Sequence, residues 1–143
     1  MTSTRDSLVA TARESSAKAH APYSGVHVGA AIRAASGKLY CGSNVENAAY
    51  PLGNCAEASA IAAGVQAEGA AFRIAETAVW ATGPGGAPIA ASPCGGCRQR
   101  IREFAVDGAV KIHFPREGGA VQSATLDELL PYAFTLPATR RGA

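Results

Sequence analysis

The sequence has no uninterrupted apolar run of about 18 residues, which is the length that a membrane-spanning helix needs. Its first residues, from Met1 to Asp6, lack the basic-then-apolar order of a secretory signal. No segment is repetitive or of low complexity, and no interior linker is long enough to divide the chain. We therefore expect a single cytoplasmic domain over residues 1–143, with no membrane partner.

The chain also carries little net charge. The 13 Lys and Arg residues are nearly balanced by 11 Asp and Glu residues, so the formal net charge is only +2. A nucleic-acid groove usually needs clustered Lys and Arg residues, and the sequence shows neither such a cluster nor an aromatic surface. The balance favours a small-molecule substrate over a nucleic acid, in a chain long enough to bury a sizeable core.

Only four cysteines are present. Thiols stay reduced in the cytosol, so a C-x-x-C pair such as Cys94 and Cys97 indicates a metal more than a disulfide. Cys55 can complete a set of three ligands. Three protein ligands leave one tetrahedral position open, as in catalytic zinc sites, whereas structural zinc sites take four. The remaining cysteine, Cys41, is expected to be a small buried hydrophobic residue.

Glu57 follows Cys55 by two residues in a segment that is predicted to be helical. Its carboxylate can therefore face the open coordination position without being a ligand, which is where a general base belongs. Cys55 and the C-x-x-C pair both stand where helices are expected to begin. The free N–H groups and positive dipole ends of these helices favour thiolates.

Hydrophobic periodicity and turn residues predict the element order α-β-β-α-β-α-β-β-α. This order predicts an α/β fold, a three-layer α/β/α sandwich around a mixed five-stranded sheet. The expected helices cover residues 3–20, 55–68, 94–104 and 126–130, and the expected strands cover residues 26–33, 39–41, 74–82, 109–114 and 121–124.

Four further segments accompany the C-A-E and P-C-x-x-C elements: A-P-Y-S at 21–24, V-G-A-A at 28–31, N-V-E-N-A-A-Y at 44–50 and L-L-P-Y-A-F at 129–134. In order and spacing they resemble the small cytidine deaminases, over residues 21–134. The zinc elements match the ligand pattern and the non-ligand Glu of zinc deaminases in general.

The resemblance implies one Zn²⁺ per subunit, held by Cys55, Cys94 and Cys97. It implies hydrolytic deamination of cytidine or deoxycytidine in pyrimidine salvage, with Glu57 moving the protons while water replaces the amine at C4. The Ala56 N–H and the turn at Cys94 would fix the base.

The resemblance also implies that Asn44 and Glu46 bind the ribose, although by themselves they fit a polar strand end that satisfies its own loop. It implies a homotetramer with shared active sites. Tyr50 would contribute to the pocket, and Phe134 from a neighbouring subunit would be its main aromatic lid.

Two positions depart from the family pattern. Val26 replaces the aromatic residue that packs on the base, and Ala58 replaces an Arg that hydrogen-bonds the thiolates and offsets their charge. Arg98 and Arg100 are the candidates to supply that charge instead. The Arg is also missing in the related blasticidin S deaminases, so blasticidin S or a modified cytosine nucleoside is the alternative substrate.

Two rival functions use the same motifs. A structural zinc module would need a fourth protein ligand, for which Cys41, His27 and His113 are the candidates. A deaminase acting on tRNA or single-stranded DNA usually has a His as its first ligand and basic, aromatic surfaces.

Overall fold

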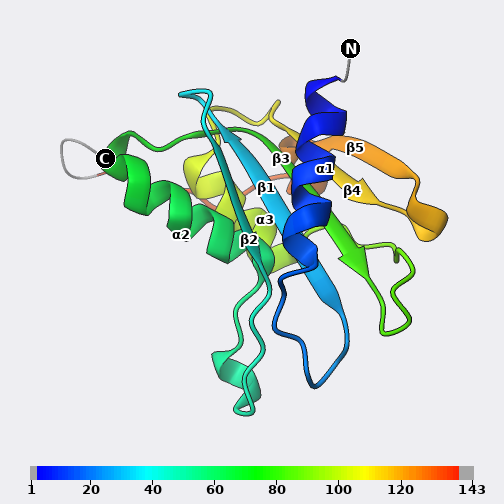
Figure 1. Cartoon of the computed structure of the whole chain (residues 1–143). Helices are drawn as coiled ribbons and strands as arrows, with labels where there is room; N and C mark the ends of the chain where they lie inside the picture. Colours follow the sequence, from blue (N-terminus) through cyan, green and yellow to red (C-terminus); the bar gives the residue numbers. More distant parts are fainter. Residues whose placement is uncertain (1–2, 139–143) are drawn as a thin grey trace.

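The computed structural model describes residues 3–138 and contains a five-stranded sheet with helices on both faces (Figure 1). The strand order is β2-β1-β3-β4-β5, and β3 and β4 are parallel while the other neighbours are antiparallel. The strands are β1 (His27–Ala34), β2 (Leu39–Ser43), β3 (Ile74–Thr82), β4 (Lys111–Pro115) and β5 (Val121–Thr125). The predicted mixed five-stranded sheet of a three-layer α/β fold is confirmed.

One helix, α1 (Thr4–Ser16), covers one face of the sheet by itself (Figure 1). It approaches β1 closely at Gly29, because a Cβ atom there would lie 2.0 Å from the carbonyl oxygen of Ala12. The predicted end of this helix at His20 is wrong. The backbone of His20 instead donates to Asn44 O at 3.0 Å and accepts from Glu46 N at 2.8 Å, so it pairs with an extended segment.

The opposite face carries α2 (Ala56–Glu68), α3 (Gly95–Phe104) and the short α4 (Leu126–Leu129). Gly42 on β2 lets α2 pack tightly, because a Cβ atom there would lie 2.5 Å from the backbone nitrogen of Ala60. The larger hydrophobic core lies between these helices and the sheet, and its aromatic centre is Phe72, which is fully buried.

Buried polar contacts tie the strands together at His113. Its Nε2 lies 2.6 Å from Glu76 and its Nδ1 lies 2.7 Å from Ser123, while Glu76 also accepts a hydrogen bond from Arg33 at 3.2 Å. These bonds give His113 a structural role between β3, β4 and β5. Cys41, by contrast, lies exposed on the edge strand β2, so the expectation that it is buried is wrong.

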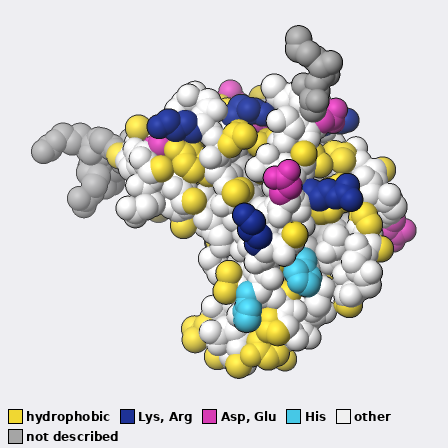
Figure 2. Space-filling view, viewed as in Figure 1, with side chains coloured by type: hydrophobic (Ala, Val, Ile, Leu, Met, Phe, Trp, Pro, Cys, Tyr) yellow, Lys and Arg dark blue, Asp and Glu magenta, His cyan; other side chains and the backbone are white. Residues whose placement is uncertain are grey.

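Residues 44–54 leave the end of β2 and form a projection that includes the single-turn helix Tyr50–Leu52 (Figure 1). Tyr50 and Leu52 are 76% and 71% exposed, and hydrophobic side chains gather at this tip (Figure 2). Tyr23 meets Tyr50 edge to face, with ring centroids 6.0 Å apart. Among the described residues, no helix combines the length and the apolar character that crossing a membrane demands.

Candidate active site

Two helix starts bring the metal-ligating residue types together. Cys55 is the N-cap of α2 and Cys94 is the N-cap of α3, in extended backbone conformations and without a side-chain cap hydrogen bond. The first N–H groups of a helix have no partner inside the helix. Both helix starts therefore present unpaired donors and a positive dipole end to the same region.

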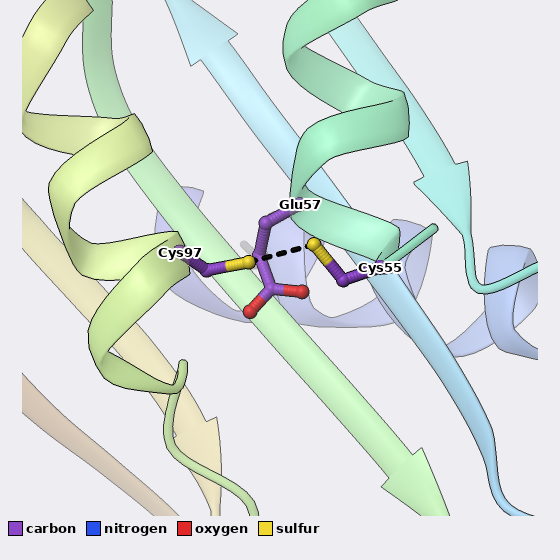
Figure 3. Close-up of side chains that lie close together, drawn as sticks. All are labelled: Cys55, Glu57 and Cys97. Carbon is purple, nitrogen blue, oxygen red and sulfur yellow. Dashed lines mark hydrogen bonds between the residues drawn. The ribbon is translucent and has the colours of Figure 1, made fainter. Parts of the chain in front are cut away.

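Cys55, Glu57 and Cys97 form a group whose ligand atoms all lie within 4.8 Å of one another. The two Sγ atoms are 2.7 Å apart, and the Glu57 carboxylate lies beside the line that joins them (Figure 3). Cys97 is fully buried and Glu57 is 5% exposed. The structure thus brings together three of the four residues that the sequence predicts for the zinc site, and their roles there stay predictions.

The close contact shifts the pKa values of the two thiols in opposite directions. The hydrogen bond from Cys97 lowers the pKa of Cys55 to about 6, and the same bond together with burial raises the pKa of Cys97. Burial raises the pKa of Glu57 above its ordinary value, and the nearby Cys55 adds to this effect. A carboxylate with a raised pKa is better suited to hold and return a proton near neutral pH.

Cys94 is exposed and does not belong to that group of three. It remains one helical turn from Cys97, and its Sγ lies 3.9 Å from the place that a Cβ atom on Gly96 would take. Its part as the third ligand stays a prediction.

Arg98 and Arg100 have different partners. Arg98 donates to the carbonyls of Pro93 at 2.7 Å and Leu129 at 2.8 Å and to Ser92 Oγ at 3.1 Å, so it holds the loop before α3 to the end of α4. Arg100 donates from Nη1 to Cys97 Sγ at 3.6 Å. Arg100 is therefore the arginine that reaches the thiols.

A cleft of about 480 Å³ opens next to Cys55. Its lining includes three of the predicted substrate-binding residues, Asn44, Glu46 and Tyr50. The full lining is Tyr23, Ser24, Asn44, Val45, Glu46, Asn47, Tyr50, Gly53, Asn54 and Cys55. The size suits a small organic molecule.

Asn44 and Glu46 also brace the wall of this cleft. The Asn44 side chain accepts from Val28 N at 2.8 Å and donates to Val26 O at 2.9 Å. The Glu46 carboxylate accepts from the backbone N–H groups of Tyr23 at 3.0 Å and Ser24 at 3.1 Å, and from the Ser24 hydroxyl. The hydroxyl bond is the main reason that the pKa of Glu46 is lowered.

The other predicted contacts do not line this cleft. Ala56 is fully buried at the start of α2, and Val26 lies next to the cleft wall without lining it. Phe134 is 67% exposed, and its carbonyl accepts a hydrogen bond from Gln99 at 2.9 Å. It borders a different hollow, next to Val65 and Arg102, so it does not reach the cleft of its own subunit.

The donor set fits zinc. Thiols are soft ligands that suit Zn²⁺, and a buried carboxylate beside them suits proton transfer more than a structural site. Within residues 3–138 the metal-competent group includes no histidine. His113 is bonded to Glu76 and Ser123, so the structural zinc module loses one candidate for its fourth ligand.

The sequence predicts no individual role for Tyr23 and Ser24, although both lie in the A-P-Y-S segment that resembles the family. Their contact with Glu46 joins parts of the chain 22 and 23 positions apart, which periodicity does not reveal. Arg98 and Arg100 are both predicted candidates to offset the thiolate charge. Spacing distinguishes them, because Arg100 lies three residues after Cys97 and therefore on the same side of the helix.

Comparison with known proteins places the chain among deaminases. The family model "Cytidine and deoxycytidylate deaminase zinc-binding region" matches residues 2–113. A cytidine deaminase from Sporosarcina psychrophila is 35% identical over 91% of this chain and 90% of its own length. A cytidine deaminase from Halalkalibacterium halodurans is 37% identical over 92% of this chain and 94% of its own length.

Solved structures agree. The crystal structure of cytidine deaminase from Burkholderia pseudomallei has a TM-score of 0.76 and 34% identity, and the match covers 92% of this chain and 100% of that one. The cytidine deaminase from Mycobacterium tuberculosis has a TM-score of 0.75 and 32% identity, covering 94% and 100%.

Proposed function

The chain belongs to the cytidine and deoxycytidylate deaminase family, and we propose that Glu57 and the thiols beside it convert cytidine or deoxycytidine into the uracil nucleoside and ammonia. The protein is a zinc-dependent hydrolytic deaminase. Cys55, Cys94 and Cys97 would hold one Zn²⁺ per subunit. The bound ion supplies the Lewis acidity that makes water a nucleophile near neutral pH.

Glu57 moves the protons of the reaction. Its carboxylate accepts a proton as water attacks C4 of the cytosine ring and a C4–O bond forms. It delivers this proton to ring N3. It then takes a second proton from the new C4 hydroxyl and passes it to the amine, so that the C4–N bond breaks, the C4=O bond forms and ammonia leaves. The raised pKa of Glu57 lets the same group act first as base and then as acid.

Asn44 and Glu46 would bind the sugar hydroxyls from the cleft wall. Both side chains are already held by backbone groups, so they are oriented before the substrate arrives. Such preorganisation limits the entropy that binding costs. The backbone N–H of Ala56 and the turn at Cys94 would fix the base beside Glu57.

One observation carries this proposal: the buried Glu57 carboxylate lies beside the thiols of Cys55 and Cys97, and Cys55 lines a cleft together with Asn44 and Glu46. The test is the ultraviolet change on a panel of cytosine nucleosides, with zinc content measured on the same sample. We expect loss of the cytosine spectrum with cytidine and deoxycytidine and about one zinc per subunit. A zinc-loaded protein that deaminates neither nucleoside would contradict the proposal. Blasticidin S belongs in the panel, and the cytidine deaminase relatives favour the first two substrates.

We further propose a homotetramer in which active sites are shared. Among the exposed large hydrophobic side chains are Tyr50 and Leu52 on the projection beside the cleft, and Phe134 and Leu136 near the C-terminus. Monomers rarely leave such groups of apolar surface uncovered. Contacts between these places on neighbouring subunits would put Phe134 over a partner's cleft. The reaction would serve pyrimidine salvage in the cytoplasm.

A further inference from the structure

The resemblance to the small cytidine deaminases implies an arginine beside the zinc thiolates at position 58, where this chain has Ala58 on α2. Ala58 borders a surface hollow of about 460 Å³ between α2 and α3. Arg100 borders the same hollow from α3. Helix α3 therefore places an arginine beside the same hollow that α2 borders with the uncharged Ala58.

The Arg100 guanidinium is placed to act on all the thiols of the site. Its Nη1 donates to Cys97 Sγ at 3.6 Å. A Cβ atom on Gly96 would lie 3.3 Å from this Nη1 and 3.9 Å from Cys94 Sγ, so the guanidinium and the third thiol face the same point. The charges of Cys55, Cys97 and Cys94 raise the pKa of Arg100.

We propose that Arg100 is the positioning residue that offsets the excess negative charge of the three-thiolate zinc site, in the place of the arginine missing at position 58. The proposal rests on the zinc site of the proposed function. Two positive charges on zinc against three thiolates leave one negative charge in excess, and Arg100 brings the total to zero. Its donated hydrogen bond also holds Cys97 in its ligating orientation.

Groups that hydrogen-bond metal ligands orient them and tune their basicity, and their loss typically costs about 10–100-fold in metal affinity. Arg98 is directed elsewhere, since its guanidinium donates to Pro93, Ser92 and Leu129, and among the described residues it makes no hydrogen bond to a thiol. Arg102 offers a matched control. It lies on α3 two residues further on, and the described part of the structure gives it no bond to a thiol.

The experiment measures zinc affinity by competition with a colorimetric chelator, for the wild type, Arg100→Ala, Arg102→Ala and the double variant Ala58→Arg/Arg100→Ala. Circular dichroism checks that each variant is folded. We expect Arg100→Ala to bind zinc about 10–100-fold more weakly, Arg102→Ala to match the wild type, and the double variant to recover most of the lost affinity.

Three results would overturn the proposal. The first is unchanged zinc affinity in Arg100→Ala, and the second is an equal loss in Arg102→Ala. The third is a folded double variant that recovers nothing, because the effect would then belong to Arg100 packing and not to a cation beside the thiolates. A wild type that binds no zinc would instead refute the proposed function itself, so the two failures are distinguishable.

Discussion

The Sγ atoms of Cys55 and Cys97 lie 2.7 Å apart although 42 positions separate these residues in the chain. The contact arises because α2 and α3 lie on the same face of the sheet and begin side by side (Figure 3). Cys55 caps α2, and Cys97 lies in the first turn of α3. The grouping of these residues is thus a consequence of where two helices start.

Glu57→Gln is expected to keep zinc and fold but lose about 10²–10⁴-fold in turnover, the usual contribution of general acid–base catalysis. Gln keeps the volume of the side chain and cannot carry a proton. Steady-state kinetics on cytidine and zinc analysis of the same sample measure both effects. Glu14→Gln, exposed on α1 across the sheet, is the control and should match the wild type. Loss of zinc from Glu57→Gln would show instead that Glu57 is a ligand.

Phe134→Ala tests the shared active site. If Phe134 covers the cleft of a neighbouring subunit, its removal should raise KM for cytidine while each subunit still binds zinc. Light scattering reports the assembly, which should weaken because a large exposed ring leaves the interface. Gln99→Ala is a companion variant, because Gln99 holds the Phe134 carbonyl at 2.9 Å and should show a smaller change in the same direction. A monomeric wild type, or an unchanged KM in Phe134→Ala, would contradict the proposal that active sites are shared between subunits.

Local sequence patterns predicted some elements well. Strand β3 (Ile74–Thr82) has the predicted bounds because its apolar stretch from Ala78 to Ala81 lacks the alternating polarity of a half-exposed strand, which indicates a buried one. The sequence also predicts the starts of α2 and α3 to within one residue. The predicted first residues, Cys55 and Cys94, are the N-caps of these helices in the structure.

The failures share a physical cause, which is that they depend on partners distant in the sequence. The helical stripe of α1 continues to His20, but backbone bonds to Asn44 and Glu46 draw His20 into an extended pairing. Cys41 has an apolar side chain, yet its strand lies at the edge of the sheet, where it is exposed. Hydrophobic periodicity predicts neither the backbone pairing of a segment nor the position of a strand in the sheet.

Gly29→Ala should destabilise the fold severely. A Cβ atom there would lie 2.0 Å from Ala12 O and 2.4 Å from Ser16 N, and backbone atoms of a packed helix cannot give way cheaply. Overpacking typically costs about 1–3 kcal/mol, and we expect the upper part of that range or insoluble protein. Urea unfolding measures the loss. Gly85→Ala, where the added Cβ meets nothing within 4 Å, should leave stability nearly unchanged. Equal effects in the two variants would contradict the close packing of α1.

Tyr40→Phe is expected to change how stability depends on pH. The Tyr40 hydroxyl donates to the Glu68 carboxylate at 2.6 Å and links β2 to the end of α2. This bond, followed by one from Ser36, lowers the pKa of Glu68 below its ordinary value of 4.5. Because the folded-state pKa is the lower one, the stabilisation is present above pH 4.5 and is lost as pH falls through the folded-state value.

Tyr40→Phe should therefore be less stable than the wild type at neutral pH, and the difference should shrink below pH 4.5 as Glu68 is protonated in both proteins. Phe keeps the edge-to-face contact with Phe72, whose ring centroid lies 5.8 Å away, so the comparison isolates the hydroxyl. Urea unfolding at neutral and acidic pH measures the difference. Tyr132→Phe, at a fully exposed side chain, is the control and should shift neither curve. A constant difference across this pH range would show that the hydroxyl does not act through the Glu68 carboxylate.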